Sequence, residues 1–213
     1  MQEIREVGKL KESSVAITFD DGYKSTYSVV FPMLQSHGVT ATVYPYIDWI
    51  DGRLTPWWLM LVGMIDQCEL TLKEIGKIEM VLGKSVGLDA NLLKVPADAR
   101  CALLGNIQRD MMRMDDDTRN HIIGQLRGCM PNGRDVFYGL HESMTWEQVK
   151  EMSAYGIRFG AHTCSHANLS HVTLKTAEHE IIESKRVIEN HLGIEVTGFA
   201  YPYGYDVDRK SVV

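Results

Sequence analysis

Apolar and polar positions along this chain alternate between strand-like runs and helix-like stripes. The apolar, β-branched run at residues 15–19 predicts a buried strand, and residues 41–46 predict a second one. Between them, residues 24–37 carry apolar positions at helical spacing, with an imperfection at Pro32 and a suitable end at Gly38. A strand, a helix and a strand in this order predict a right-handed parallel unit.

The pattern changes between about residue 48 and residue 140. Pro56 opens an apolar run typical of a helix, residues 69–82 suggest a hairpin, and residues 96–113 and 116–127 predict two further helices. Several of the eleven methionines fall here, where they suit the filling of a small irregular core better than a binding surface. We therefore predict one domain over residues 1–213, with a mainly helical insertion at residues 48–140.

The strand and helix pattern then resumes. Thr145 and Gln148 fit a capping box at the start of a helix that Gly156 ends. Strands are predicted at residues 157–161 and 195–200, on either side of a helix at residues 174–192. The predicted fold class is α/β with a parallel sheet.

Composition and charge narrow the class of protein. A net charge of −6 argues against nucleic acid as the main partner. No apolar run is long enough to span a bilayer, and the first residues lack the basic-then-apolar order of a signal peptide. Four scattered cysteines without a C-x-x-C pair predict reduced thiols. We expect a cytoplasmic protein, or an extracytoplasmic one if the natural N-terminus lies upstream.

Two adjacent carboxylates follow the first predicted strand. Asp20 and Asp21 precede Gly22, where the backbone must turn sharply. Side chains alternate along an extended chain, so the two carboxylates point in different directions and suit two distinct roles. The same three residues are also ordinary turn formers, so this signal alone does not establish a site.

Two histidines follow a later predicted strand. His162 and His166 are four residues apart, and within one helical turn they face the same side and can share one metal ion. A pair of solvated or capping histidines fits this spacing equally well. Cys164 lies between them, and we expect it to point away as a small buried residue.

A third turn, at residues 201–204, again comes directly after a predicted strand. In parallel α/β architectures the carboxyl ends of the strands meet at one rim, where sites assemble. Two histidines and one carboxylate form a catalytic zinc set that leaves positions open for water and substrate. The second carboxylate is then free to act as a base.

The three turns together resemble one known family. Residues 18–22 (TFDDG), 162–166 (HTCSH) and 201–204 (YPYG) are similar, in order and placement, to the first three motifs of the polysaccharide deacetylases, carbohydrate esterase family four. The resemblance extends over about residues 15–206, and the segment with Trp57 and Trp58 looks like an insertion of bacterial members from exopolysaccharide gene clusters. It implies a distorted (β/α) barrel of about seven strands.

The resemblance also implies roles for individual residues. Asp20 would be the general base that takes a proton from a metal-bound water, and Asp21, His162 and His166 would hold zinc or another divalent metal. The backbone N–H of Tyr203 would help to stabilise the oxyanion.

The residues next to these would have further roles. Tyr201, Pro202 and Tyr203 would contact the substrate, and Thr163 and Ser165 would orient the histidines. The implied reaction is the hydrolysis of N-acetyl groups on an N-acetylglucosamine-containing polysaccharide, with release of acetate.

The chain departs from the family pattern in two places. Ala200 occupies the position of an arginine that orients the base in many members, and this form of the motif is more like members acting on extracellular poly-N-acetylglucosamine-type polymers. The chain also ends before the motifs that supply the last strands, an apolar pocket wall and a general-acid histidine. Residues 208–213 correspond to a sequencing adapter read to its stop codon, so we predict a non-native tail on a partial domain with low stability and little activity.

Two other functions stay open from the sequence. Relatives with the same fold hydrolyse cyclic amides of purine catabolism, in a small closed pocket rather than a groove. A carbohydrate-binding or assembly module without catalysis is the second alternative, with Ala200 as its first sign. The presence of all four candidate catalytic and metal residues argues against loss of catalysis.

Overall fold

Three short parallel strands and a group of helices beside them make up the described part of the chain. The computed structural model describes residues 15–66, 72–86, 97–129 and 142–204. Strands β1 (Thr18–Asp21), β2 (Thr42–Pro45) and β3 (Arg158–Phe159) pair in this order, and both pairings are parallel. The predicted α/β class with a parallel sheet is therefore confirmed.

The first strand differs from its prediction in one respect. Val15 is 87% exposed, and residues 18–21 alternate between exposed and half-buried. The expectation of a buried strand was wrong because β1 lies at an edge of the sheet and, among the described residues, pairs only with β2.

The helix between the first two strands begins with a widened turn. A π-helical turn, η1 (Thr26–Val30), leads into α2 (Phe31–His37), and the N–H of Phe31 donates to the carbonyl of Thr26. Pro32 has no N–H to donate to the preceding turn, which explains the imperfection expected there. Gly38 ends the helix with φ 61°, as predicted.

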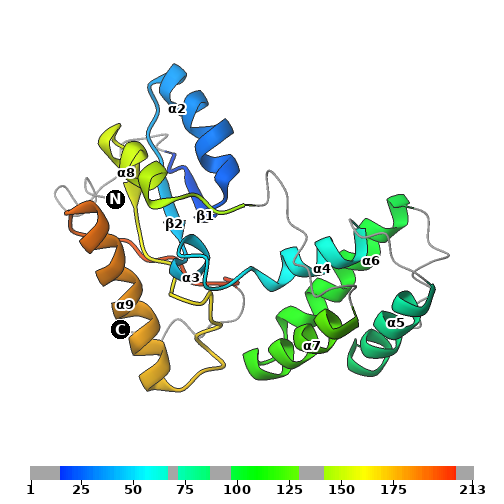
Figure 1. Ribbon diagram of the computed structural model, residues 1–213. Helices are drawn as coiled ribbons and strands as arrows, with labels where there is room; N and C mark the ends of the chain where they lie inside the picture. Colours follow the sequence, from blue (N-terminus) through cyan, green and yellow to red (C-terminus); the bar gives the residue numbers. More distant parts are fainter. Residues whose placement is uncertain (1–14, 67–71, 87–96, 130–141, 205–213) are drawn as a thin grey trace.

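Four helices between residues 57 and 129 form a lobe of their own, here called the helical lobe (Figure 1). They are α4 (Trp57–Asp66), α5 (Leu72–Val86), α6 (Ala97–Met112) and α7 (Asp116–Cys129). Their shared core includes the fully buried side chains of Leu61, Ile78, Leu82, Ile107 and Met111. The three helices predicted here from apolar periodicity are confirmed, whereas the assignment of residues 48–140 as an insertion stays a prediction.

The hairpin expected at residues 69–82 is wrong. Leu72–Val86 forms the helix α5, which buries Ile78 and Leu82 at helical spacing against the rest of the helical lobe. Gly76 and Lys77, in the middle of the segment predicted to be a hairpin, lie on the exposed side of this helix. A short run of apolar residues does not distinguish the two-residue period of a strand from the 3.6-residue period of a helix.

The rest of the described chain forms the sheet lobe, in which α3 (Ile47–Ile50), α8 (Trp146–Ala154) and α9 (Leu174–Leu192) accompany the strands (Figure 1). The capping box of Thr145 and Gln148 is present, and α9 has the predicted bounds. The strand predicted at residues 195–200 is reduced to one parallel bridge between Ala161 and Phe199. None of the described helices is long and apolar enough to cross a membrane.

Tyr44 explains why glycine follows β3. A Cβ atom at Gly160 would collide with the ring of Tyr44, which also approaches Gly198 on the neighbouring segment. We predict that Gly160→Ala lowers the free energy of unfolding by about 1–3 kcal/mol, because the ring must leave its place between the two segments. Urea unfolding followed by circular dichroism measures the change.

Gly124 supplies the matched control. It lies in α7 with open space around its Cα, so Gly124→Ala should stabilise the protein by up to about 1 kcal/mol through helix propensity. Equal effects of the two substitutions would contradict the role given to Tyr44.

Candidate metal centre and adjoining cavity

The predicted site residues lie in three segments at the carboxyl ends of neighbouring strands. Asp20 and Asp21 end β1, the loop with His162 and His166 follows β3, and the turn at residues 201–204 follows the segment bridged to Ala161. The parallel order of the strands brings these segments to one rim, as expected from the sequence.

Asp21 and the two histidines converge on one point. The Oδ1 atom of Asp21 lies 3.5 Å from Nε2 of His162 and 3.2 Å from Nε2 of His166. Among the described residues, these three side chains offer ligand atoms that all lie within 4.8 Å of one another. One carboxylate and two imidazoles are a donor set that suits zinc and related divalent metals.

The protonation of the cluster also suits a cation. Burial opposes ionisation of Asp21, but the two adjacent imidazoles outweigh it and hold the pKa of this carboxyl well below its usual range. Burial lowers the pKa of His166 despite the nearby carboxylate, which favours the neutral ring that a metal requires. The buried Oδ1 of Asp21 has no hydrogen-bond partner of good geometry, so a bound cation would satisfy it.

A backbone carbonyl orients His162. Its Nδ1 lies 2.8 Å from the carbonyl oxygen of Ala200 and donates to it, which leaves the Nε2 lone pair facing Asp21. The expectation that Thr163 and Ser165 orient the imidazoles was wrong. Thr163 Oγ1 has no hydrogen-bond partner, and Ser165 Oγ donates to Glu180 instead.

The loop at residues 162–166 is not helical, although the histidine spacing suggested one helical turn. Thr163 and His166 have φ values of 67° and 59°, which lie in the left-handed region. The carbonyls of Thr163 and Cys164 accept hydrogen bonds from the N–H groups of Ile47 and Asp48 at the start of α3. These long-range bonds hold both histidines toward Asp21 without a helix.

Backbone strain is concentrated at the site. Among the described residues, four non-glycine residues have positive φ, namely Asp21, Thr163, His166 and Tyr203. All four belong to the three converging segments. Such conformations persist where surrounding contacts determine them, and they are common at functional sites.

Glu180 of α9 holds the loop at residues 162–166 in place. Its carboxylate accepts the N–H groups of Cys164 and Ser165 at 2.7 and 3.0 Å and the Ser165 hydroxyl at 2.8 Å. Sequence analysis missed this buried residue; its only signal was a polar side chain near the apolar stripe of the helix. Cys164 is buried as expected, and burial together with the Glu180 charge raises its pKa to about 12.

We predict that Glu180→Gln lowers the free energy of unfolding by about 1–3 kcal/mol and weakens metal binding, because an amide cannot accept all three donors. Thermal unfolding and isothermal titration with zinc measure the two effects. Glu183→Gln, at a half-buried position of the same helix that pairs with Arg186, is the control and should change neither. Equal losses in both variants would contradict the loop-fastening role.

A cavity of about 390 Å³ adjoins the three converging side chains. The sheet lobe contributes Asp20, Asp21, His162 and His166 to its lining, and the helical lobe contributes Trp57, Trp58, Gln108 and Met112 of α4 and α6. Tyr201, Tyr203 and Gly204 complete the lining, whereas Pro202 is buried and does not line the cavity. The cavity therefore lies between the two lobes.

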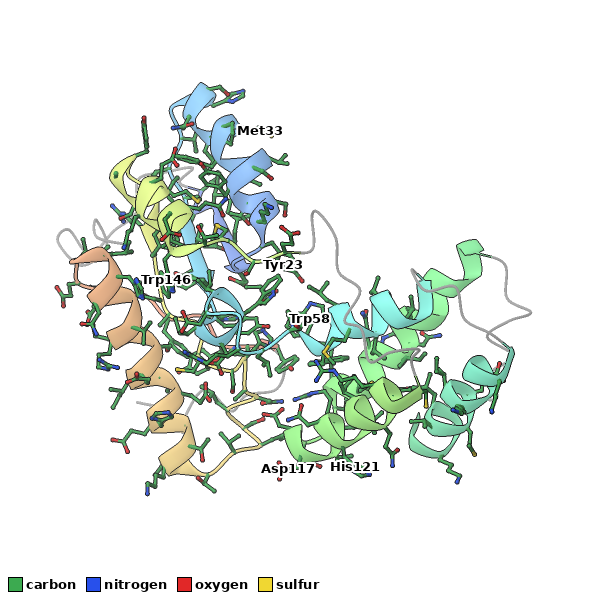
Figure 2. The ribbon with its side chains drawn as sticks, in the orientation of Figure 1. Tyr23, Met33, Trp58, Asp117, His121 and Trp146 are labelled. Atoms are coloured by element: carbon green, nitrogen blue, oxygen red, sulfur yellow. The ribbon has the colours of Figure 1, made fainter. Side chains whose placement is uncertain are left out.

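Aromatic contacts hold the apolar side of the cavity in place. Figure 2 shows Tyr23 and Trp58 side by side where the lobes meet, and Trp58 Nε1 donates to the Tyr23 hydroxyl at 2.7 Å. The ring of Trp58 also lies 4.8 Å from that of His166. Burial, with a smaller contribution from Asp21, raises the pKa of Tyr23 to about 12, so its hydroxyl stays protonated. Sequence analysis noted Trp57 and Trp58 without placing them at the site.

Comparison with known families gives a match over most of the chain. The sequence model of a family described as polysaccharide deacetylase matches residues 7–96 and 119–212. YxkH of Bacillus subtilis is 21% identical over 196 residues, which are 92% of this chain and 39% of that protein. The poly-β-1,6-N-acetyl-D-glucosamine N-deacetylase of Escherichia coli K12 is 44% identical over 52 residues, which are 24% of this chain and 8% of that protein.

The chain thus spans about two-fifths or less of the length of the curated relatives it matches. Among solved structures, the Streptococcus pyogenes deacetylase PplD superposes with a TM-score of 0.49 at 16% identity, over 97% of this chain and 54% of that chain. The deacetylase domain of BpsB from Bordetella bronchiseptica gives 0.47 at 16% identity, over 94% and 60%.

Proposed function

Because this chain belongs to the polysaccharide deacetylase family, we propose that it carries the centre of a metal-dependent enzyme that removes N-acetyl groups from an aminosugar polymer. The products are acetate and the free amine. The observation that carries this proposal is the convergence of Asp21, His162 and His166 beside a cavity that Asp20 also lines.

Asp21, His162 and His166 would hold zinc or another divalent metal. When bound, this metal supplies an activated water and polarises the acetyl carbonyl. The Ala200 carbonyl fixes the His162 tautomer, and the fastened loop keeps both Nε2 atoms on the cavity side. A set of three protein ligands leaves room for water and substrate.

Asp20 would act as the general base. It is exposed, lines the same cavity as Asp21, His162 and His166, and is adjacent to Asp21 in β1. Asp20 is not among the three converging ligand residues, so it could take the proton of the attacking water while Asp21 remains with the histidines. Two adjacent residues at one strand end would thus supply both the general base and a metal ligand.

Tyr203 would supply the oxyanion donor through its backbone N–H. The residue lines the cavity and has φ 67°, a conformation that redirects its peptide relative to an extended chain. A fixed N–H next to the metal set stabilises the negative charge that develops on the carbonyl oxygen.

We propose an N-acetylglucosamine-containing polymer, of the poly-N-acetylglucosamine type, as the substrate. The similarity of a short segment to the Escherichia coli N-deacetylase supports this choice, as does the alanine at position 200. Tyr201 and Tyr203 would contact the sugar, with Pro202 shaping the turn behind them. Tyr201 is 39% exposed at the cavity, and an exposed aromatic ring suits the apolar face of a sugar.

The finer fold and domain assignments are proposals on the same basis. A distorted barrel would continue from the bridge between Ala161 and Phe199, which adds a fourth segment to the parallel order. The helical lobe would lie within an insertion at residues 48–140 of one domain. The predicted non-native tail at residues 208–213 lies outside the described residues.

The test is acetate release from N-acetylglucosamine oligomers by the product of the whole open reading frame that encodes this sequence. We expect release with added zinc, its loss on chelation and its return when zinc is restored. A protein that binds zinc at one equivalent yet releases no acetate would contradict the proposal and favour the cyclic-amide or non-catalytic alternatives.

A further inference from the structure

A buried arginine lies between the helical lobe and the turn that carries Tyr203. Arg119 of α7 is only 2% exposed, and its guanidinium donates to the carbonyls of Met111 and Met114 at 3.3 and 3.4 Å. It also forms an ion pair with Asp116, one turn earlier. Burying a charge costs free energy, and among the described residues Asp116 is the one carboxylate paired with Arg119, so its burial needs an explanation.

Two aromatic rings complete the surroundings of this cation. The guanidinium carbon lies 5.4 Å from the ring centroid of Trp57 and 5.3 Å from that of Tyr203. Trp57 Nε1 also donates to the Tyr203 hydroxyl at 3.1 Å, which closes a three-membered cluster. A planar guanidinium suits contact with aromatic faces, which a lysine ammonium does not reproduce.

One side chain of this cluster, that of Tyr203, also contacts a candidate metal ligand. The ring of Tyr203 meets that of His166 edge-on at 4.9 Å between centroids. The tyrosine thus touches Arg119 and Trp57 on one side and a candidate metal ligand on the other. Because its backbone is left-handed, side-chain contacts are needed to hold this conformation in place.

We propose that Arg119 is a positioning residue, which acts through the ring of Tyr203 to fix the turn that presents the Tyr203 N–H to the reacting carbonyl. This inference rests on the proposed function for its kinetic consequence. It makes α7 of the helical lobe part of the catalytic apparatus, although no atom of Arg119 lines the cavity.

The test compares Arg119→Met with Arg113→Met, which removes a 76% exposed arginine just before α7. In Arg119→Met we expect kcat for acetate release to fall about 10- to 100-fold while KM changes less, since the Tyr203 donor is displaced but the remaining cavity lining, including Tyr201, stays in place. Backbone amides of residues 199–204 should exchange with deuterium about tenfold faster, whereas those of α9 should not. Arg119→Lys should recover part of kcat, and Arg113→Met should leave kcat and exchange unchanged.

A double variant identifies the route of the effect. If Arg119 acts through Tyr203, then Arg119→Met combined with Tyr203→Leu will lose no more kcat than Tyr203→Leu alone. A folded Arg119→Met variant with normal kcat and normal exchange at residues 199–204 overturns the proposal, as do additive losses in the double variant. If Arg119→Met does not fold, Arg119→Lys takes its place in the cycle with the same expectations.

The two proposals fail separately. Absence of acetate release by the unaltered protein contradicts the proposed function, and the exchange measurement then decides alone whether Arg119 holds the turn. Normal acetate release with exchange unaffected at residues 199–204 contradicts only the role of Arg119.

Discussion

An Asp20→Asn variant will bind zinc as tightly as the unaltered protein and release acetate about 10²–10⁴-fold more slowly. The size of the loss is that of a general base removed from its reaction. Metal affinity is retained because Asp20 is not among the three converging ligand residues. Isothermal titration with zinc and an enzyme-coupled acetate assay measure the two quantities on the same preparation.

Asp117→Asn is the matched control for this variant. Asp117 is an exposed carboxylate in the first turn of α7 and does not line the cavity. It should leave both zinc affinity and acetate release unchanged. Retained turnover in Asp20→Asn would assign the base to another residue, and lost zinc binding would place Asp20 among the ligands.

Replacing His166 by alanine should weaken zinc binding by more than about a hundredfold and abolish acetate release at micromolar zinc. Loss of a direct ligand should exceed the 10- to 100-fold typical of residues that merely orient one. His162→Ala should behave in the same way, because both Nε2 atoms face the same carboxylate oxygen. Competition with a zinc-binding dye measures the affinity.

His171 offers the control, since it is an exposed histidine shortly after the same loop. His171→Ala should keep both zinc affinity and turnover. Unchanged zinc affinity in His166→Ala would contradict the proposed ligand set, and restoration of turnover by millimolar zinc would support it.

Most of what could be predicted from the sequence came from local signals such as helix caps and apolar periodicity. Helix α9 has an N-cap, a stripe and a terminal glycine within one segment, and its bounds matched the prediction. The three motifs could be brought to one rim because the parallel order of strands fixes where their carboxyl ends lie. The chemical roles proposed for these motifs come from the family resemblance.

Contacts between residues distant in the sequence could not be predicted from it. The histidine loop looked helical because spacing was the only guide, whereas hydrogen bonds from α3 and from Glu180 determine its path. Arg119 carried no signal, since its partners Trp57 and Tyr203 are distant in sequence. Periodicity reports which face of an element is buried, and it does not report which residues of other elements face it.

The left-handed residues described above would link the supply of the proposed metal to the amount of folded protein. Thr163 is a buried, β-branched residue at φ 67°, and such a conformation costs about 1–3 kcal/mol. Domains of this size have only a small margin of stability, so four strained positions weigh heavily on it. A ligand that binds only the folded chain adds stability in proportion to the logarithm of its concentration. If the proposed metal binds, a cell starved of it would therefore contain less of this protein, because unoccupied copies would unfold and be degraded more often.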